Sequence, residues 1–64
     1  MSNVIDLLNE LIDTLENQND AESKFTTDTV ASLAKTYPNK NILIYHGKPK
    51  NILISLFRML ILDN

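Results

Sequence analysis

The sequence predicts an α+β fold in one small domain, residues 1–64, with two N-terminal helices followed by a C-terminal β-hairpin. Three observations favour this fold class. Apolar residues near the N-terminus recur with helical spacing, and a second periodic segment ends at a proline. The pentapeptide Lys-Asn-Ile-Leu-Ile then occurs twice, ten positions apart, with a glycine and a proline between the copies.

The first helix is expected over about residues 3–16, because its apolar residues recur three and four positions apart. These residues are Val4, Ile5, Leu8, Leu11, Ile12 and Leu15. Leu7 widens the apolar face. Ser2 or Asn3 is a suitable N-cap, and Asp6 lies favourably in the first turn.

The second helix is expected over about residues 28–36, with Thr26, Thr27 or Asp28 as its N-cap. Its apolar face again follows the three-and-four spacing and consists of Val30, Leu33, Ala34 and Tyr37. Pro38 ends this helix, because the residue before a proline is pushed out of the helical region.

The two copies of the pentapeptide are interpreted as the arms of a hairpin, with strands over about residues 41–46 and 51–62. Ile-Leu-Ile reads the same in both directions, so a reversal around Lys48 places like residues opposite each other. Pro49 disfavours the shortest turns, and a connection over residues 46–50 fits better.

The second strand is longer than the first, so residues 56–62 have no strand partner in the monomer. A bare apolar edge aggregates, and we therefore expect it to pair with a second copy and complete the sheet in a homodimer. The edge residues are Leu56, Phe57, Met59, Leu60 and Ile61. Pairing with the edge of another protein is one alternative. In the other, the segment is helical, and Asn51, Ser55 and Arg58 share a polar stripe.

The charges are unevenly distributed, although the net charge is only −2. Residues 1–28 hold seven acids and one lysine, whereas residues 29–64 hold five bases and one acid. On the first helix the acids form a stripe that continues past its end: Asp6, Glu10, Asp13 and Asp20. This stripe is either a solvated surface or a binding face for a basic partner protein.

An alternative is a small transcriptional regulator that binds nucleic acid. The candidate residues are Lys35, Lys40, Tyr45, Lys48 and Lys50. Four lysines in sixteen residues are a weak basic patch in a chain of pI about 5.0. A DNA-reading helix needs polar and basic residues on its free face. The free face of the second helix has only one charged residue among Thr29, Ser32, Lys35 and Thr36, so it gives this alternative little support.

The sequence argues against enzymatic and metal-binding functions. It has no cysteine, and its one histidine, His46, lies in the expected hairpin connection without a shielding pocket. A single glycine excludes a glycine-rich phosphate loop. No cofactor is therefore expected. The absence of a secretory signal and of a long apolar stretch favours a cytoplasmic protein that does not enter membranes.

What remains is a non-enzymatic protein that binds another protein. Small acidic domains without reactive groups commonly act by occupying a partner's surface, and mobile elements encode many such inhibitors and regulators. This step is an analogy with a class of proteins.

Overall fold

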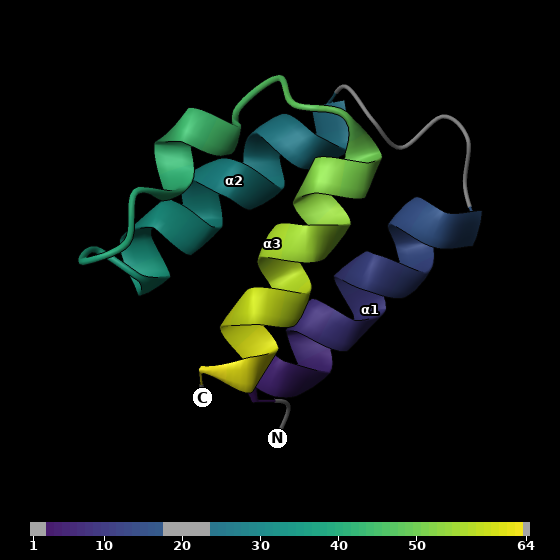
Figure 1. Cartoon of the computed structure of the whole chain (residues 1–64), viewed down its shortest axis with the longest axis horizontal. Coiled ribbons are helices and arrows are strands. Elements are labelled where there is room, and N and C mark those ends of the chain that lie inside the picture. Colours follow the sequence, from purple (N-terminus) through teal and green to yellow (C-terminus); the bar gives the residue numbers. More distant parts are fainter. Residues whose placement is uncertain (1–2, 18–23, 64) are drawn as a thin grey trace.

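The computed structural model describes residues 3–17 and 24–63, which form three α-helices and one short 3-10 helix. In chain order these are α1 (Val4–Asn17), α2 (Lys24–Thr36), η1 (Ile42–Tyr45) and α3 (Lys50–Leu62). Helices α1 and α3 pack side by side and run in opposite directions (Figure 1). Helix α2 starts near the end of this pair where α3 begins and runs away from it at an angle to α3, and η1 packs against α2.

The predicted hairpin is wrong. Residues 41–46 contain η1 and residues 51–62 lie within α3, and no strand occurs anywhere in the described part of the chain. The fold class is therefore all-α and not α+β. The expected homodimer depended on pairing between strand edges. Because the described residues form no strand, they offer no such edge, and this reason for a dimer is removed.

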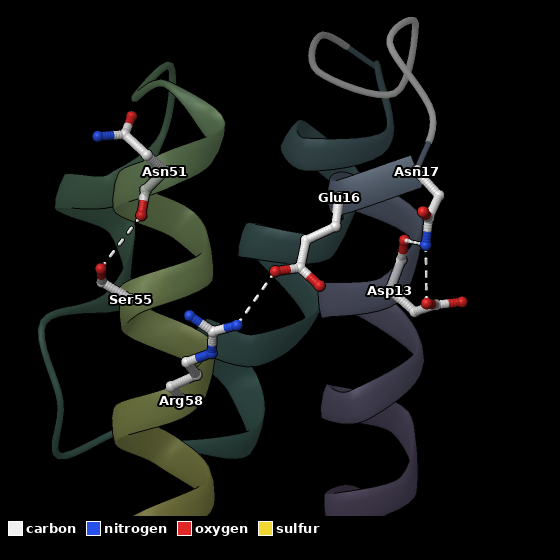
Figure 2. Close-up of polar contacts among 6 residues, drawn as sticks. All are labelled: Asp13, Glu16, Asn17, Asn51, Ser55 and Arg58. Carbon is white, nitrogen blue, oxygen red and sulfur yellow. Dashed lines mark hydrogen bonds and ion pairs between the residues drawn. The ribbon is translucent and has the colours of Figure 1, made fainter.

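Helix α3 forms because its apolar residues follow helical spacing as closely as those of α1 do. Its buried residues lie at positions i, i+3, i+4 and i+7: Leu53, Leu56, Phe57 and Leu60. Asn51, Ser55 and Arg58 are exposed on the polar side, as the helical alternative required. The Ser55 hydroxyl donates to the backbone carbonyl of Asn51 at 3.1 Å (Figure 2).

The proline between the two pentapeptides starts α3. Pro49 lies directly before the first helical residue, and its carbonyl accepts hydrogen bonds from the backbone N–H groups of Ile52 and Leu53. A proline lacks an N–H, and the N–H groups at a helix start have no partner in the helix, so this position suits it. The same residue that argued against a tight hairpin is thus a helix-start signal.

The first pentapeptide is helical only in its last three residues, 42–44, and η1 ends at Tyr45, where a reverse turn follows. The Lys48 N–H donates to the Tyr45 carbonyl at 3.2 Å, and Gly47 between them has φ +78°. With His46 at φ −61° and ψ 127°, this is a type II turn, which requires a residue with positive φ at its third position.

Replacing Gly47 by alanine should lower the free energy of unfolding by about 1–2 kcal/mol, because a side chain disfavours the left-handed conformation. A Cβ at this position meets no atom within 4 Å, so the loss comes from the backbone alone. Gly47→Asn is the control and should lose less, since asparagine tolerates this conformation better. Urea unfolding measures both, and an alanine variant as stable as the wild type would contradict the turn.

The expected start of α1 is confirmed and that of α2 is not. The Asn3 side-chain Oδ1 accepts a hydrogen bond from the Asp6 N–H at 2.9 Å, which makes Asn3 the N-cap. Helix α2 begins at Lys24, although the sequence predicted a start at about residue 28. It ends at Thr36, two residues before Pro38, as expected.

The core lies between the three helices and η1. Among the side chains that the structure describes, eleven apolar ones are buried in it: Leu8, Leu11, Ile12, Leu15, Val30, Leu33, Ile42, Leu53, Leu56, Phe57 and Leu60. Phe57 is the largest of those that are fully buried. The arrangement leaves one side of α1 in solvent along its whole length.

Candidate interaction surface

The exposed side of α1 carries three carboxylates, which we call the acidic face: Asp6, Glu10 and Asp13. At 3.6 residues per turn they point away from the buried stripe that runs from Leu8 to Leu15. The fourth predicted member, Asp20, lies outside the described residues.

In the described part of the chain, no cation compensates the charges of the acidic face. Within residues 3–17 and 24–63, none of its three carboxylates forms an ion pair. Asp13 Oδ1 accepts a hydrogen bond from the neutral Asn17 amide at 2.8 Å, and that amide also donates to the Asp13 backbone carbonyl (Figure 2). These contacts fix the carboxylate without neutralising it.

The last acid of α1 behaves differently. Glu16 lies towards α3 and accepts a hydrogen bond from Arg58 at 3.1 Å (Figure 2). Both side chains are about half exposed, so this pair contributes at most about 1 kcal/mol. Its main consequence is that Arg58 is engaged by Glu16 and not by the acidic face.

A groove lies beside the acidic face, between α1 and α2. We call it the α1/α2 groove, and it is lined by Leu7, Leu11, Asp28, Thr29, Ser32, Leu33 and Thr36. Leu11 and Leu33 are buried, whereas Leu7 is 43% exposed. The groove measures about 190 Å³, several times the roughly 30 Å³ of a water molecule in the liquid. It is large enough to receive a side chain.

A second hollow lies between α1 and α3. It is lined by Asn9, Ile12, Arg58, Ile61 and Leu62. The Arg58 guanidinium, held by Glu16, lies at this hollow, so its charge character differs from that of the α1/α2 groove.

The residues predicted as a self-association edge are separated by the helix. Leu56, Phe57 and Leu60 are buried in the core and are not available to a second chain. Ile61 is partly buried against the core, and Met59 is 41% exposed. As an edge this set is therefore wrong, because a helix turns its members in different directions.

The lysines proposed for nucleic-acid binding do not form one patch. The last turn of α2, which carries Lys35, and the first turn of α3, which begins at Lys50, lie on opposite sides of the molecule in Figure 1. Lys40 pairs with Asp63 at 2.8 Å. Lys48 is exposed in the turn before α3, and Tyr45 packs partly against the core.

The described residues contain no group of three or more His, Asp or Glu side chains arranged to hold a metal ion. His46 is exposed in the turn that Gly47 completes. A bilayer-spanning helix is likewise not found among these residues. No protein-family model matches the chain, and no curated protein or solved structure is significantly similar to it.

Sequence reasoning identified the acidic face but not the groove. Two signals for the groove were present: Leu7 widened the apolar face of α1, and Thr29, Ser32 and Thr36 formed the polar side of α2. Each signal describes one helix alone. The groove arises where the two sides meet, which depends on how the helices cross.

Proposed function

We propose that the chain is a small protein-interaction module, an inhibitor or regulator in the cytoplasm, which binds a basic surface of another protein through the acidic face of α1. One observation carries the proposal. Three exposed carboxylates lie on one side of a helix, and no cation among the described residues compensates them. Binding of this kind requires neither a cofactor nor a reaction.

The position of the acidic face favours rapid association. Like charges on one face attract a basic partner over distances of about a Debye length, which raises the association rate and makes it dependent on salt. The face is supported by a helix whose opposite side is buried in the core. Its carboxylates are therefore held on a stable element before the partner arrives.

Nucleic-acid binding through the lysines has less support. Lys40 is engaged by Asp63, and the turns that carry Lys35 and Lys50 are far apart. A groove of the kind that follows a phosphate backbone needs several cations along one path.

The proposal is tested with two variants of equal net charge. Asp6→Asn with Asp13→Asn removes two charges from the acidic face, whereas Glu16→Gln with Asp63→Asn removes two charges that are already paired. A partner is captured by a photo-crosslinker at the exposed Asn9, which leaves all three carboxylates in place. It is then identified by mass spectrometry, purified, and titrated with both variants at several salt concentrations. We expect the first variant to bind about fivefold to tenfold more weakly and the second to match the wild type.

Equal losses in both variants would contradict the role of the acidic face. Low-salt titration with duplex and single-stranded DNA is the second arm of the experiment. DNA binding that weakens steeply with salt, and is lost on Lys48→Gln with Lys50→Gln, would favour the nucleic-acid alternative instead.

A further inference from the structure

We infer that the α1/α2 groove receives an apolar side chain from a basic amphipathic helical segment of the partner. This inference rests on the proposed function and specifies the chemistry of the partner. Three properties of the groove support it: an exposed apolar floor, a Thr36 hydroxyl whose hydrogen bond stays within α2, and an acid on each side.

The floor of the groove is apolar and incompletely covered. Leu7 is 43% exposed, while Leu11 and Leu33 beneath it are at most 8% exposed. An exposed leucine in a concave site, rimmed by polar residues, is typical of binding grooves. An apolar side chain placed here removes the remaining exposed surface of Leu7 from water, which is favourable.

At Thr36 the α2 wall tolerates an apolar occupant. The Thr36 hydroxyl donates to the Ser32 backbone carbonyl at 3.2 Å, so covering this hydroxyl does not break its hydrogen bond. Burying a polar group is costly mainly when its hydrogen bond is lost.

Charge determines which segment fits. Asp28 belongs to the α2 wall. On α1, Glu10 lies one helical turn after Leu7 and therefore next to it on the helix surface. The groove thus has an acid on each side, so a segment with an apolar residue between lysines or arginines satisfies both the floor and the two carboxylates. This is the pattern of an amphipathic helix in a groove.

A second copy of the chain is a poorer occupant. Helix α1 has no lysine or arginine, and α3 has only Lys50 at its first residue and Arg58, which is paired with Glu16. The acids Asp28 and Glu10 are better matched by a foreign basic segment.

The probe for the test is a fluorescein-labelled synthetic peptide of leucine and lysine, designed so that a helix carries all leucines on one face. A peptide of the same composition with leucines on all sides is the control. Binding is measured by fluorescence anisotropy, and amide chemical shifts map the site. We expect tighter binding of the amphipathic peptide, with shifts at Leu7, Leu11 and Ser32.

Matched variants separate the groove from the acidic face. Ser32→Tyr fills the groove, and Ala31→Tyr adds the same side chain at the neighbouring exposed position, which does not line it. We expect Ser32→Tyr to weaken peptide binding by about tenfold or more, and the control by less than about twofold. If tyrosine disturbs the fold, Leu7→Ala serves as the groove variant and Ile5→Ala as its control. Circular dichroism checks that every variant is folded.

Three outcomes overturn the inference. In the first, the amphipathic peptide binds no more tightly than its control peptide. In the second, the groove variants bind the amphipathic peptide as tightly as the wild type does. In the third, light scattering shows a wild-type dimer that Ser32→Tyr dissociates, which assigns the groove to a second copy. The proposed function is judged separately, because Asp6→Asn with Asp13→Asn alters the acidic face without altering the groove lining.

Discussion

Replacing Phe57 by alanine should leave much of the chain unfolded, whereas replacing Met59 by alanine should leave it folded. The Phe57 side chain is fully buried, and a Phe→Ala change in a core costs about 3–5 kcal/mol. A chain of 64 residues has a total stability of only about 3–10 kcal/mol. Met59 is 41% exposed, so its truncation should cost about 1 kcal/mol or less.

The comparison between these two residues also tests the secondary structure. Residues 57 and 59 lie on the same face of a strand, but a helix places them about 200° apart around its axis. Urea unfolding followed by far-ultraviolet circular dichroism measures both variants. Similar losses of stability would contradict α3 and support the strand. A large loss in Phe57→Ala alone agrees with the helix.

The fold of α1 was predictable because all its local signals agree. The apolar spacing, the cap at Asn3 and the acid in the first turn each indicate a helix. Consistency of this kind is what makes a segment readable from sequence. The acidic face followed directly, since the position of one helical face determines the opposite one.

The C-terminal half was not predictable to the same degree because its signals conflict. Isoleucine and a repeated pentapeptide favour strands, while the spacing of Leu53, Leu56 and Phe57 favours a helix. Propensity is a weak signal that packing overrides. Here the helix places four apolar side chains into one core, whereas a strand leaves half of them in solvent.

The repeat shows how context decides between identical sequences. In η1 the buried member of the pentapeptide is Ile42, and the following Leu43 and Ile44 are 63% and 56% exposed. In α3 the buried member is Leu53. The turn at Gly47 ends the first copy, and the apolar residues after Ser55 extend the second. Neither cause lies within the five repeated residues.

Stability and binding should separate at two neighbouring leucines of α1. Leu8 is fully buried, so Leu8→Ala should lower the free energy of unfolding by about 2–5 kcal/mol. Leu7 is 43% exposed at the α1/α2 groove, and Leu7→Ala should cost about 1 kcal/mol or less. Alanine suits a helix interior, so neither change disturbs α1 itself.

The binding of the leucine and lysine peptide should follow the opposite order. Leu7→Ala should weaken it by about fivefold to tenfold, because Leu7 supplies the exposed part of the groove floor. The folded fraction of Leu8→Ala should bind the peptide as tightly as the wild type does. This is measured by titration at low temperature, with the affinity corrected for the fraction of the variant that is folded. A Leu7→Ala variant that loses stability and keeps its affinity would mean that the exposed leucine serves the core. The groove would then have no part in recognition.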